Sequence, residues 1–257
     1  PAWMDVMASA TRIRVDGAAL AEAAYPVTID PEIGANDLRL SDMGQDNTYD
    51  AYRPAVAYNS AADEYLVVWY GDDDLPTLVD GEYEILGQRV DAATGEALGP
   101  ALRLSDMGPD GDPAYDAFFP DVTYNPAADE YLVVWYGDDD TAPLVDEELE
   151  IYAQRVEAST GNEIGSDLRL SDMGGSGDPD YDARVPSVAY NATEDEYLVT
   201  WAGDDDTAPL VNGEYEIFGQ RVDAAGAQVG VDFRISAMGP DGDTAYEAAL
   251  PDAAYNS

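Results

Sequence analysis

The sequence predicts an all-β protein, a β-propeller built of four-stranded blades. Three observations lead to this fold class: a fixed repeat, short apolar or alternating runs inside it, and turn-forming residues between those runs. The apolar run that begins at Tyr65 and stops at Gly-Asp-Asp-Asp returns at Tyr131 and Tyr197, 66 residues apart each time (131 − 65 = 197 − 131 = 66). A strand copied at a fixed period is typical of a repeat architecture.

Four strands are expected in each repeat, A to D. Strand A begins at Pro54 with alternating large and small residues, and strand B at Tyr65 is apolar on both faces, as in an interior strand. Strand C begins at Ile85 and strand D at Leu98. Gly, Pro, Asn and Asp fill the connections, so the strands should form an up-and-down meander. Two connections are long and acidic, from B to C and from D to the next A.

The repeat periods are 54–119, 120–185 and 186–250, with partial blades at 11–53 and 251–257. Thr11 to Asp16 match strand C, Leu38 to Gly44 match strand D, and Pro251 to Asn256 match strand A. Two arrangements fit: a four-bladed ring closed by the terminal strands, or a segment of a longer propeller. Residues 16–24 are the only helix-friendly stretch.

The chain resembles bacterial extracellular β-propeller repeats with the runs Pro-x-Val-Ala-Tyr-Asn, Tyr-Leu-Val-Val-Trp and Gly-Gln-Arg-Val-Asp-Ala. The likeness covers nearly all of residues 38–257. It implies the fold and a secreted or cell-surface location. It implies little about activity, because propellers host binding, scaffolding and catalysis alike.

The charge balance and the missing residue types restrict the classes of partner and of catalytic chemistry. The chain has 54 acidic and 11 basic residues, all of the latter Arg, for a net charge of −43, and it has no His or Cys. Such a chain repels nucleic acid and anionic membranes, and no apolar run is long enough for a membrane helix. Without His, Lys or Cys the usual bases and nucleophiles are missing. Paired carboxylates could still hydrolyse a glycoside, but the acids recur in every repeat.

Eight of the 11 arginines recur at one position of strand C or strand D. A residue copied into every blade is expected to be structural, pairing with neighbouring carboxylates. Only Arg12, Arg53 and Arg184 lie outside this pattern.

The acidic loops suit Ca²⁺, which takes six to eight oxygen ligands from flexible loops. The alternative is acidic surface turns in which Asp side chains cap local N–H groups. Adjacent carboxylates repel, so Arg, backbone donors or a cation should offset them. The candidate metal ligands are Asp42, Asp46, Asp72, Asp73, Asp74, Asp106, Asp110, Asp112, Asp138, Asp139, Asp140, Asp172, Asp178, Asp180, Asp204, Asp205, Asp206, Asp241 and Asp243.

The aromatic residues divide into three repeated sets. The Trp of strand B and the Tyr of strand A should be core, and the loop Tyr should anchor the acidic loops, with sugar stacking as the alternative. These sets are Trp69, Trp135 and Trp201; Tyr58, Tyr124, Tyr190 and Tyr255; and Tyr49, Tyr115, Tyr181 and Tyr246.

These patterns favour a secreted or surface-displayed binding or scaffold module, of an adhesin or matrix type, stabilised by Ca²⁺. Its partner would be carbohydrate or another protein. One alternative is a polysaccharide lyase or glycosidase on a propeller scaffold. Another is a filament subunit in which residues 251–257 pair with residues 11–16 of a neighbouring chain.

Calcium binding can be tested by thermal unfolding with EGTA and then with Ca²⁺ restored. A site-specific ion at a hundredfold excess over its Kd should add about 2.7 kcal/mol to the free energy of unfolding. An equal effect of Mg²⁺ or of NaCl would leave only a solvated acidic surface.

Overall fold

The computed structural model describes residues 2–7, 10–15, 39–41, 43, 49–73, 78–139 and 141–256. The chain divides into two units, Pro1–Leu38 and Arg39–Ser257. In the first unit, β1 (Ala2–Met7) and β2 (Ala10–Val15) pair antiparallel, with Ala2 opposite Val15. The strand expected from Thr11 is therefore confirmed as β2. The helix-friendly residues 16–24 lie outside the described residues.

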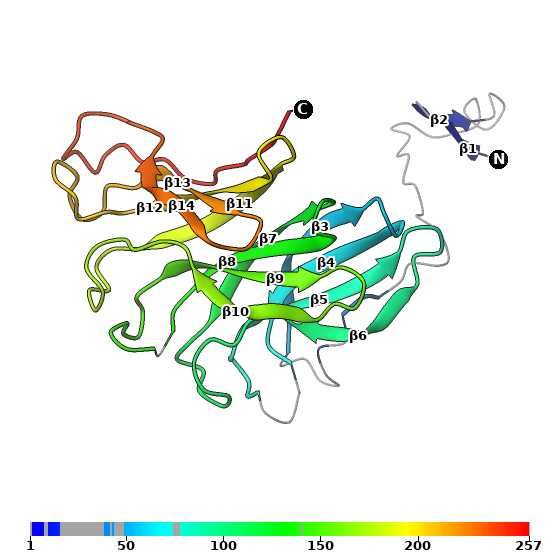
Figure 1. Cartoon of the computed structure of the whole chain (residues 1–257), viewed down its shortest axis with the longest axis horizontal. Helices are drawn as coiled ribbons and strands as arrows, with labels where there is room; N and C mark the ends of the chain where they lie inside the picture. Colours follow the sequence, from blue (N-terminus) through cyan, green and yellow to red (C-terminus); the bar gives the residue numbers. More distant parts are fainter. Residues whose placement is uncertain are drawn as a thin grey trace, which may run out of the picture. The chain divides into compact units, whose positions relative to one another are not determined.

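The second unit holds three four-stranded antiparallel sheets (Figure 1). In each sheet the strands follow one another in sequence order, which confirms the expected meander and its four strands. None of the described residues forms a helix able to span a membrane. The strands are β3 (Ala51–Asn59), β4 (Glu64–Gly71), β5 (Glu84–Asp91) and β6 (Ala97–Arg103); β7 (Ala117–Asn125), β8 (Glu130–Gly137), β9 (Glu150–Glu157) and β10 (Glu163–Arg169); and β11 (Ala183–Asn191), β12 (Glu196–Gly203), β13 (Glu216–Asp223) and β14 (Gln228–Arg234).

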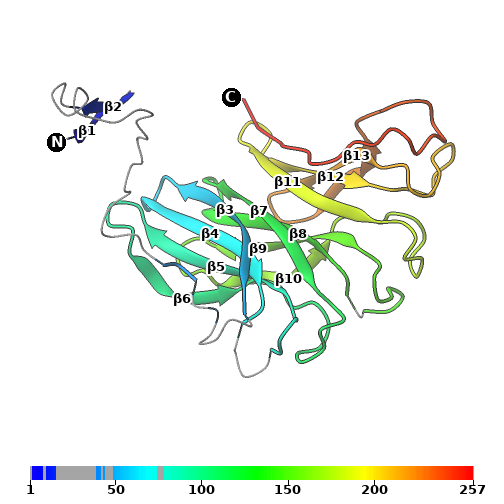
Figure 2. The same cartoon turned by 180° about the vertical axis from the view of Figure 1, so that it is seen from behind.

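Each sheet covers the next, and the first strands β3, β7 and β11 lie side by side (Figures 1 and 2). Successive residues of a strand point to opposite faces, so the second sheet serves two cores. Tyr131 and Trp135 belong to one buried cluster with Leu66 of the first sheet, whereas Leu132 belongs to another with Trp201 of the third. All three repeated Trp residues are buried, as expected. The described sheets do not close into a ring.

A bulge interrupts each first strand at the residue before its proline. Arg53, Phe119 and Val185 have φ of 50°, 50° and 52°, and the register with the second strand shifts there. Non-glycine residues in this left-handed region cost free energy, which the surrounding sheet must offset. The residue just before each bulge is Tyr52, Phe118 or Arg184, the last residue in register before the shift.

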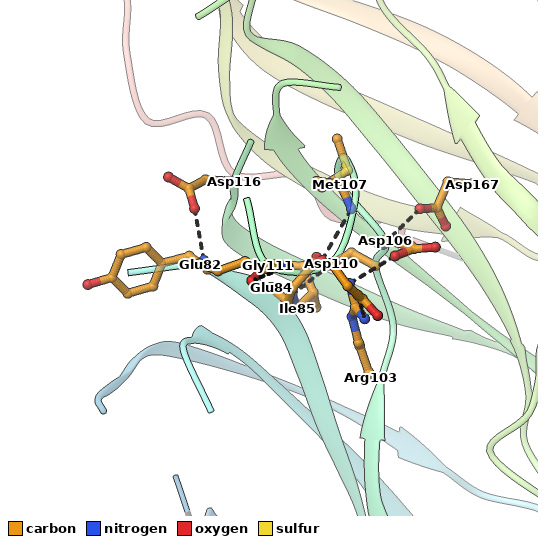
Figure 3. A network of polar contacts seen from close by, with 12 residues as sticks. Glu82, Glu84, Ile85, Arg103, Asp106, Met107, Asp110, Gly111, Asp116 and Asp167 are labelled. Atoms are coloured by element: carbon orange, nitrogen blue, oxygen red, sulfur yellow. Dashed lines mark hydrogen bonds and ion pairs between the residues drawn. The ribbon is translucent and has the colours of Figure 1, made fainter. Parts of the chain in front are cut away.

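A buried glutamate fixes the end of each sheet. Glu150 at the start of β9 has no exposed surface and accepts hydrogen bonds from Ser171 Oγ, Arg169 Nη2 at 2.9 Å and Met173 N at 2.9 Å. Figure 3 shows the same arrangement around Glu84. A second ion pair joins strands B and C, as in Arg155 with Glu130. The prediction that the repeated arginines are structural is confirmed for Arg89, Arg103, Arg155, Arg169, Arg221 and Arg234.

Three expectations need correction. Tyr190 is buried, but its counterpart Tyr58 is 46% exposed, because no sheet of the described residues covers that face of the first sheet. Tyr255 is also exposed. Residues 251–256 form no strand, since no described strand pairs with them, although Ala253 N donates to Ser187 Oγ at 3.1 Å. Of the D strand expected from Leu38, the described residues 39–41 are not in a strand. Pairing of residues 251–257 with residues 11–16 of a second copy stays a prediction.

The buried glutamate should matter far more than the peripheral one. We expect Glu150→Ala to lower the free energy of unfolding by about 3–5 kcal/mol, because it leaves the Arg169 guanidinium without its buried partner. Glu196→Ala removes the partner of the half-exposed Arg221 and should cost no more than about 1 kcal/mol. Urea unfolding of both variants measures the difference. Equal losses would contradict this account of the sheets.

Candidate functional site

The first aspartate of each Gly-Asp-Asp-Asp run is buried and holds backbone N–H groups. Asp138 accepts from Asp116 N at 2.9 Å and from Glu147 N at 3.0 Å, which ties the acidic loop to the start of β7. Asp72 does the same in the first sheet, and Asp204 accepts from Gly213 N. Backbone donors therefore offset part of the repulsion expected in these runs.

Other candidate metal ligands also have partners within the chain. Asp106 and Asp110 pair with Arg103 at 2.8 and 2.5 Å, Asp172 pairs with Arg169, and Asp241 pairs with Arg234. Five accept N–H groups from residues two positions ahead, namely Asp112, Asp139, Asp178, Asp205 and Asp243.

The remaining candidates give no metal cluster. Asp73 is buried, Asp180 and Asp206 are exposed, and Asp42, Asp46, Asp74 and Asp140 lie outside the described residues. In the part of the chain that the structure describes, no three acidic side chains are arranged to hold a metal ion. Ca²⁺ binding therefore stays a prediction.

The loop tyrosines pack against glycines of the same loops. A Cβ added at Gly108 would lie 2.7 Å from Cβ of Tyr115, and its φ of 69° also favours glycine. The pairs Gly174 with Tyr181 and Gly239 with Tyr246 repeat this contact. The geometry favours the loop-anchoring role over sugar stacking at these positions.

A groove between the second and third sheets departs from the repeat. Its volume is about 560 Å³, and we call it the Arg184 groove. It is lined by five carboxylates, one aromatic ring and one guanidinium, together with apolar loop residues: Asp116, Asp138, Asp146, Glu147, Asp182, Phe118, Arg184, Pro113, Ala114, Leu149 and Pro179.

Arg184 stands where the repeat places an aromatic ring. Its counterparts 66 and 132 residues earlier are Phe118 and Tyr52, each just before the strand bulge. The Arg184 guanidinium pairs with Asp182 at 2.6 Å and lies over the Tyr215 ring, 5.9 Å from its centroid. The sequence marked Arg184 as an exception to the arginine pattern, but without the fold it could not be joined to Asp182 and Phe118.

The repeated carboxylate before each first strand is used differently in the second and third sheets. Asp116 accepts a hydrogen bond from Tyr83 N at 2.8 Å (Figure 3). Asp182 instead accepts from Arg184 and, at 3.2 Å, from the Tyr215 hydroxyl, both through Oδ2. The residue is only 7% exposed, and its Oδ1 is buried with no hydrogen-bond partner among the described residues. A buried unpaired acceptor is costly, so a donor from a ligand would be favourable there.

Asp116 differs from an ordinary carboxyl in its proton affinity. Burial, together with the nearby carboxylates Asp138, Glu82 and Asp72, raises its pKa to about 7, against the lowering effect of the hydrogen bond from Tyr83 N. Near neutral pH this side chain can therefore hold a proton. The groove thus combines a protonatable carboxyl, a carboxylate paired with Arg184 and an aromatic ring, which suits a ligand rich in hydroxyl groups.

Comparison with known proteins gives no family. No protein-family model matches the sequence, and no curated protein matches it. The solved structures that it resembles include an N-acetylgalactosamine deacetylase from F. plautii in complex with blood group B trisaccharide, at 15% identity and a TM-score of 0.49. They also include a thermostable family-43 glycoside hydrolase, at 14% identity and a TM-score of 0.47.

These alignments cover 76% and 77% of this chain, but only 56% of each of the two solved chains. The chain thus spans about half the length of those structures. At such low similarity its chemistry must be argued from its own residues.

The raised pKa of Asp116 predicts a pH-dependent effect on stability. Its proton is bound more tightly in the folded chain than in the unfolded one, so its contribution is favourable at low pH and is lost as pH rises through about 7. Asp116→Asn should leave stability unchanged near pH 4 and raise it at pH 8, by about 1 kcal/mol after allowance for solvent screening. Thermal unfolding at both pH values measures this. Asp50→Asn, at the exposed equivalent position, is the control, and an equal gain there would contradict the assignment.

Proposed function

We propose that this chain binds carbohydrate in the Arg184 groove. The observation that supports it most is the buried, unpartnered Oδ1 of Asp182, beside an arginine that the repeat does not require. A sugar hydroxyl can donate to Oδ1, and neighbouring hydroxyls can accept from the guanidinium. The Phe118 ring offers an apolar face for the C–H face of a sugar ring. A volume of about 560 Å³ is within the usual range for small-ligand sites.

A second candidate function, cleavage of a glycosidic bond, rests on the same groove. Glycoside hydrolysis needs one carboxylic acid that donates a proton and one carboxylate that acts as base or nucleophile. Asp116, with its pKa raised to about 7, suits the acid, and Asp182, paired with Arg184, suits the carboxylate. In the sequence, the recurrence of the acids in every repeat argued against catalysis. In the fold, the equivalent residues Asp116 and Asp182 have different hydrogen-bond partners. The secreted location and the adhesin or matrix role stay predictions.

Carbohydrate binding is tested on an array of neutral, acidic and acetylated oligosaccharides, followed by calorimetric titration of those that bind. We expect Arg184→Phe, which restores the residue type of position 118, to weaken binding at least about tenfold, because a charge-assisted partner is lost. Arg221→Ala, which changes an exposed arginine outside the groove, should bind like the wild type. Equal binding by Arg184→Phe and the wild type would contradict the proposal.

Hydrolysis has a separate readout, the release of reducing sugar from the bound glycans. Asp116→Asn should abolish release while leaving binding within about threefold, because Asn keeps the acceptor for Tyr83 N but cannot donate an acidic proton. Binding without release by the wild type would remove the enzymatic candidate and keep the binding one.

A further inference from the structure

A pocket formed by β9, β10 and the loop after β8, with Asp106 from the loop after β6, differs in its lining from the equivalent pocket of the third sheet. Its volume is about 630 Å³. We call it the Tyr152 pocket, after the β9 residue in its lining. The polar side chains that line it and carry the argument are Asp106, Asp139, Tyr152, Glu163, Ser166 and Asp167.

Four of these side chains are more polar than their counterparts in the first sheet. The pairing of the third and fourth strands fixes the correspondence, since Tyr152 faces Arg169 as Leu86 faces Arg103 and Phe218 faces Arg234. Tyr152 replaces Leu86 and Phe218, Glu163 replaces Ala97 and Gln228, Ser166 replaces Pro100 and Val231, and Asp167 replaces Ala101 and matches Asp232. All four residues differ from those of the first sheet, and Tyr152, Glu163 and Ser166 differ from those of the third sheet as well.

The Tyr152 hydroxyl has no hydrogen-bond partner among the described residues. The residue is 3% exposed, and its hydroxyl is buried without a hydrogen bond. Burial raises the pKa of this phenol, so it remains a neutral hydroxyl. The counterparts Leu86 and Phe218 show that an apolar side chain is accommodated at this position. The hydroxyl is thus a cost to the fold unless something in the pocket bonds to it.

The pocket is lined by several acidic side chains, and its one arginine, Arg169, is already bonded to other residues. Asp106 N donates to Asp167 Oδ2 at 3.3 Å, which brings these two acidic residues together (Figure 3). Burial, together with the carboxylates of Glu163, Asp106 and Asp139, raises the pKa of Asp167 to about 7, against the lowering effect of the hydrogen bond from Asp106 N. Arg169 is bound to Glu150, Asp172 and the Ser171 carbonyl. A cation entering the pocket would relieve this repulsion.

The size and lining favour an organic cation over a bare metal ion. The described residues offer no group of three acidic side chains placed to hold a metal. The pocket is far larger than the roughly 30 Å³ that one water molecule occupies. Pro143 and Leu144 add apolar side chains to the lining.

We propose that the Tyr152 pocket binds a small aliphatic amine, with an ammonium group held by Asp167 and Glu163 and by the Tyr152 hydroxyl as acceptor. The methylene chain of the ligand lies along Pro143 and Leu144. This site is independent of the Arg184 groove and does not rest on the carbohydrate proposal.

The test is calorimetric titration of the full chain with 1,4-diaminobutane in about 150 mM NaCl, where long-range charge effects are screened. We expect one site per chain. Asp167→Asn should weaken it at least about tenfold, and Tyr152→Phe about two- to tenfold, as for loss of a single hydrogen bond. Asp232→Asn, the same position in the third sheet, is the matched control and should bind like the wild type.

Three results would overturn the proposal. The first is no binding above the NaCl background. The second is an equal loss in Asp167→Asn and Asp232→Asn, which would mean that the amine only screens the net charge of −43. The third is CaCl₂ binding at the same site with equal or higher affinity, which would assign the pocket to a metal. Thermal unfolding of each variant verifies that it is folded.

Discussion

A glutamate side chain with almost no exposed surface begins the third strand of each sheet, at positions 84, 150 and 216. It gathers an arginine and a serine from the end of the fourth strand and a backbone N–H from the loop beyond, as Glu150 does with Arg169, Ser171 and Met173. Such a carboxylate is tolerable in the interior only when its oxygens are fully bonded. The position of the loop after the fourth strand depends on it, and so does the wall of the Tyr152 pocket, which includes Arg169 and Asp106.

The loops that join one sheet to the next are held at their other end by the buried aspartates that follow the second strands. Asp138 holds the backbone just before β7 and the tip of its own acidic loop. That contact places Asp116 at the edge of the Arg184 groove. Many carboxylates of this chain therefore stabilise the loops, because they accept hydrogen bonds from backbone N–H groups that water or turn residues would otherwise satisfy.

The sequence was sufficient for the strands of the three four-stranded sheets and their order, because alternation, turn residues and the repeat all agreed there. It was not sufficient for the partial blades, since residues 39–41 and 251–256 are not in strands. It was also sufficient for the paired arginines, since a cation copied into every repeat needs a copied partner. It failed where burial depends on a neighbouring sheet: Tyr58 and Tyr190 look alike in sequence, yet only Tyr190 is covered. It also could not separate Asp116 from Asp182, whose local sequences match and whose partners lie on other strands. Arg184 was visible in the sequence as an exception to the arginine pattern, whereas Tyr152 was not singled out, and only the fold joins each to the residues around it.

The departures from the repeat have a consequence for the use of this scaffold. Consider a consensus chain in which each position takes the residue type found in at least two of the three sheets. It would keep the buried glutamates, their arginines and the aspartates that hold the loops. It would replace Arg184 with an aromatic residue and Tyr152 with an apolar one. Such a chain would keep the architecture but lack the distinguishing side chains of both the Arg184 groove and the Tyr152 pocket. Either set of side chains could then be reintroduced separately.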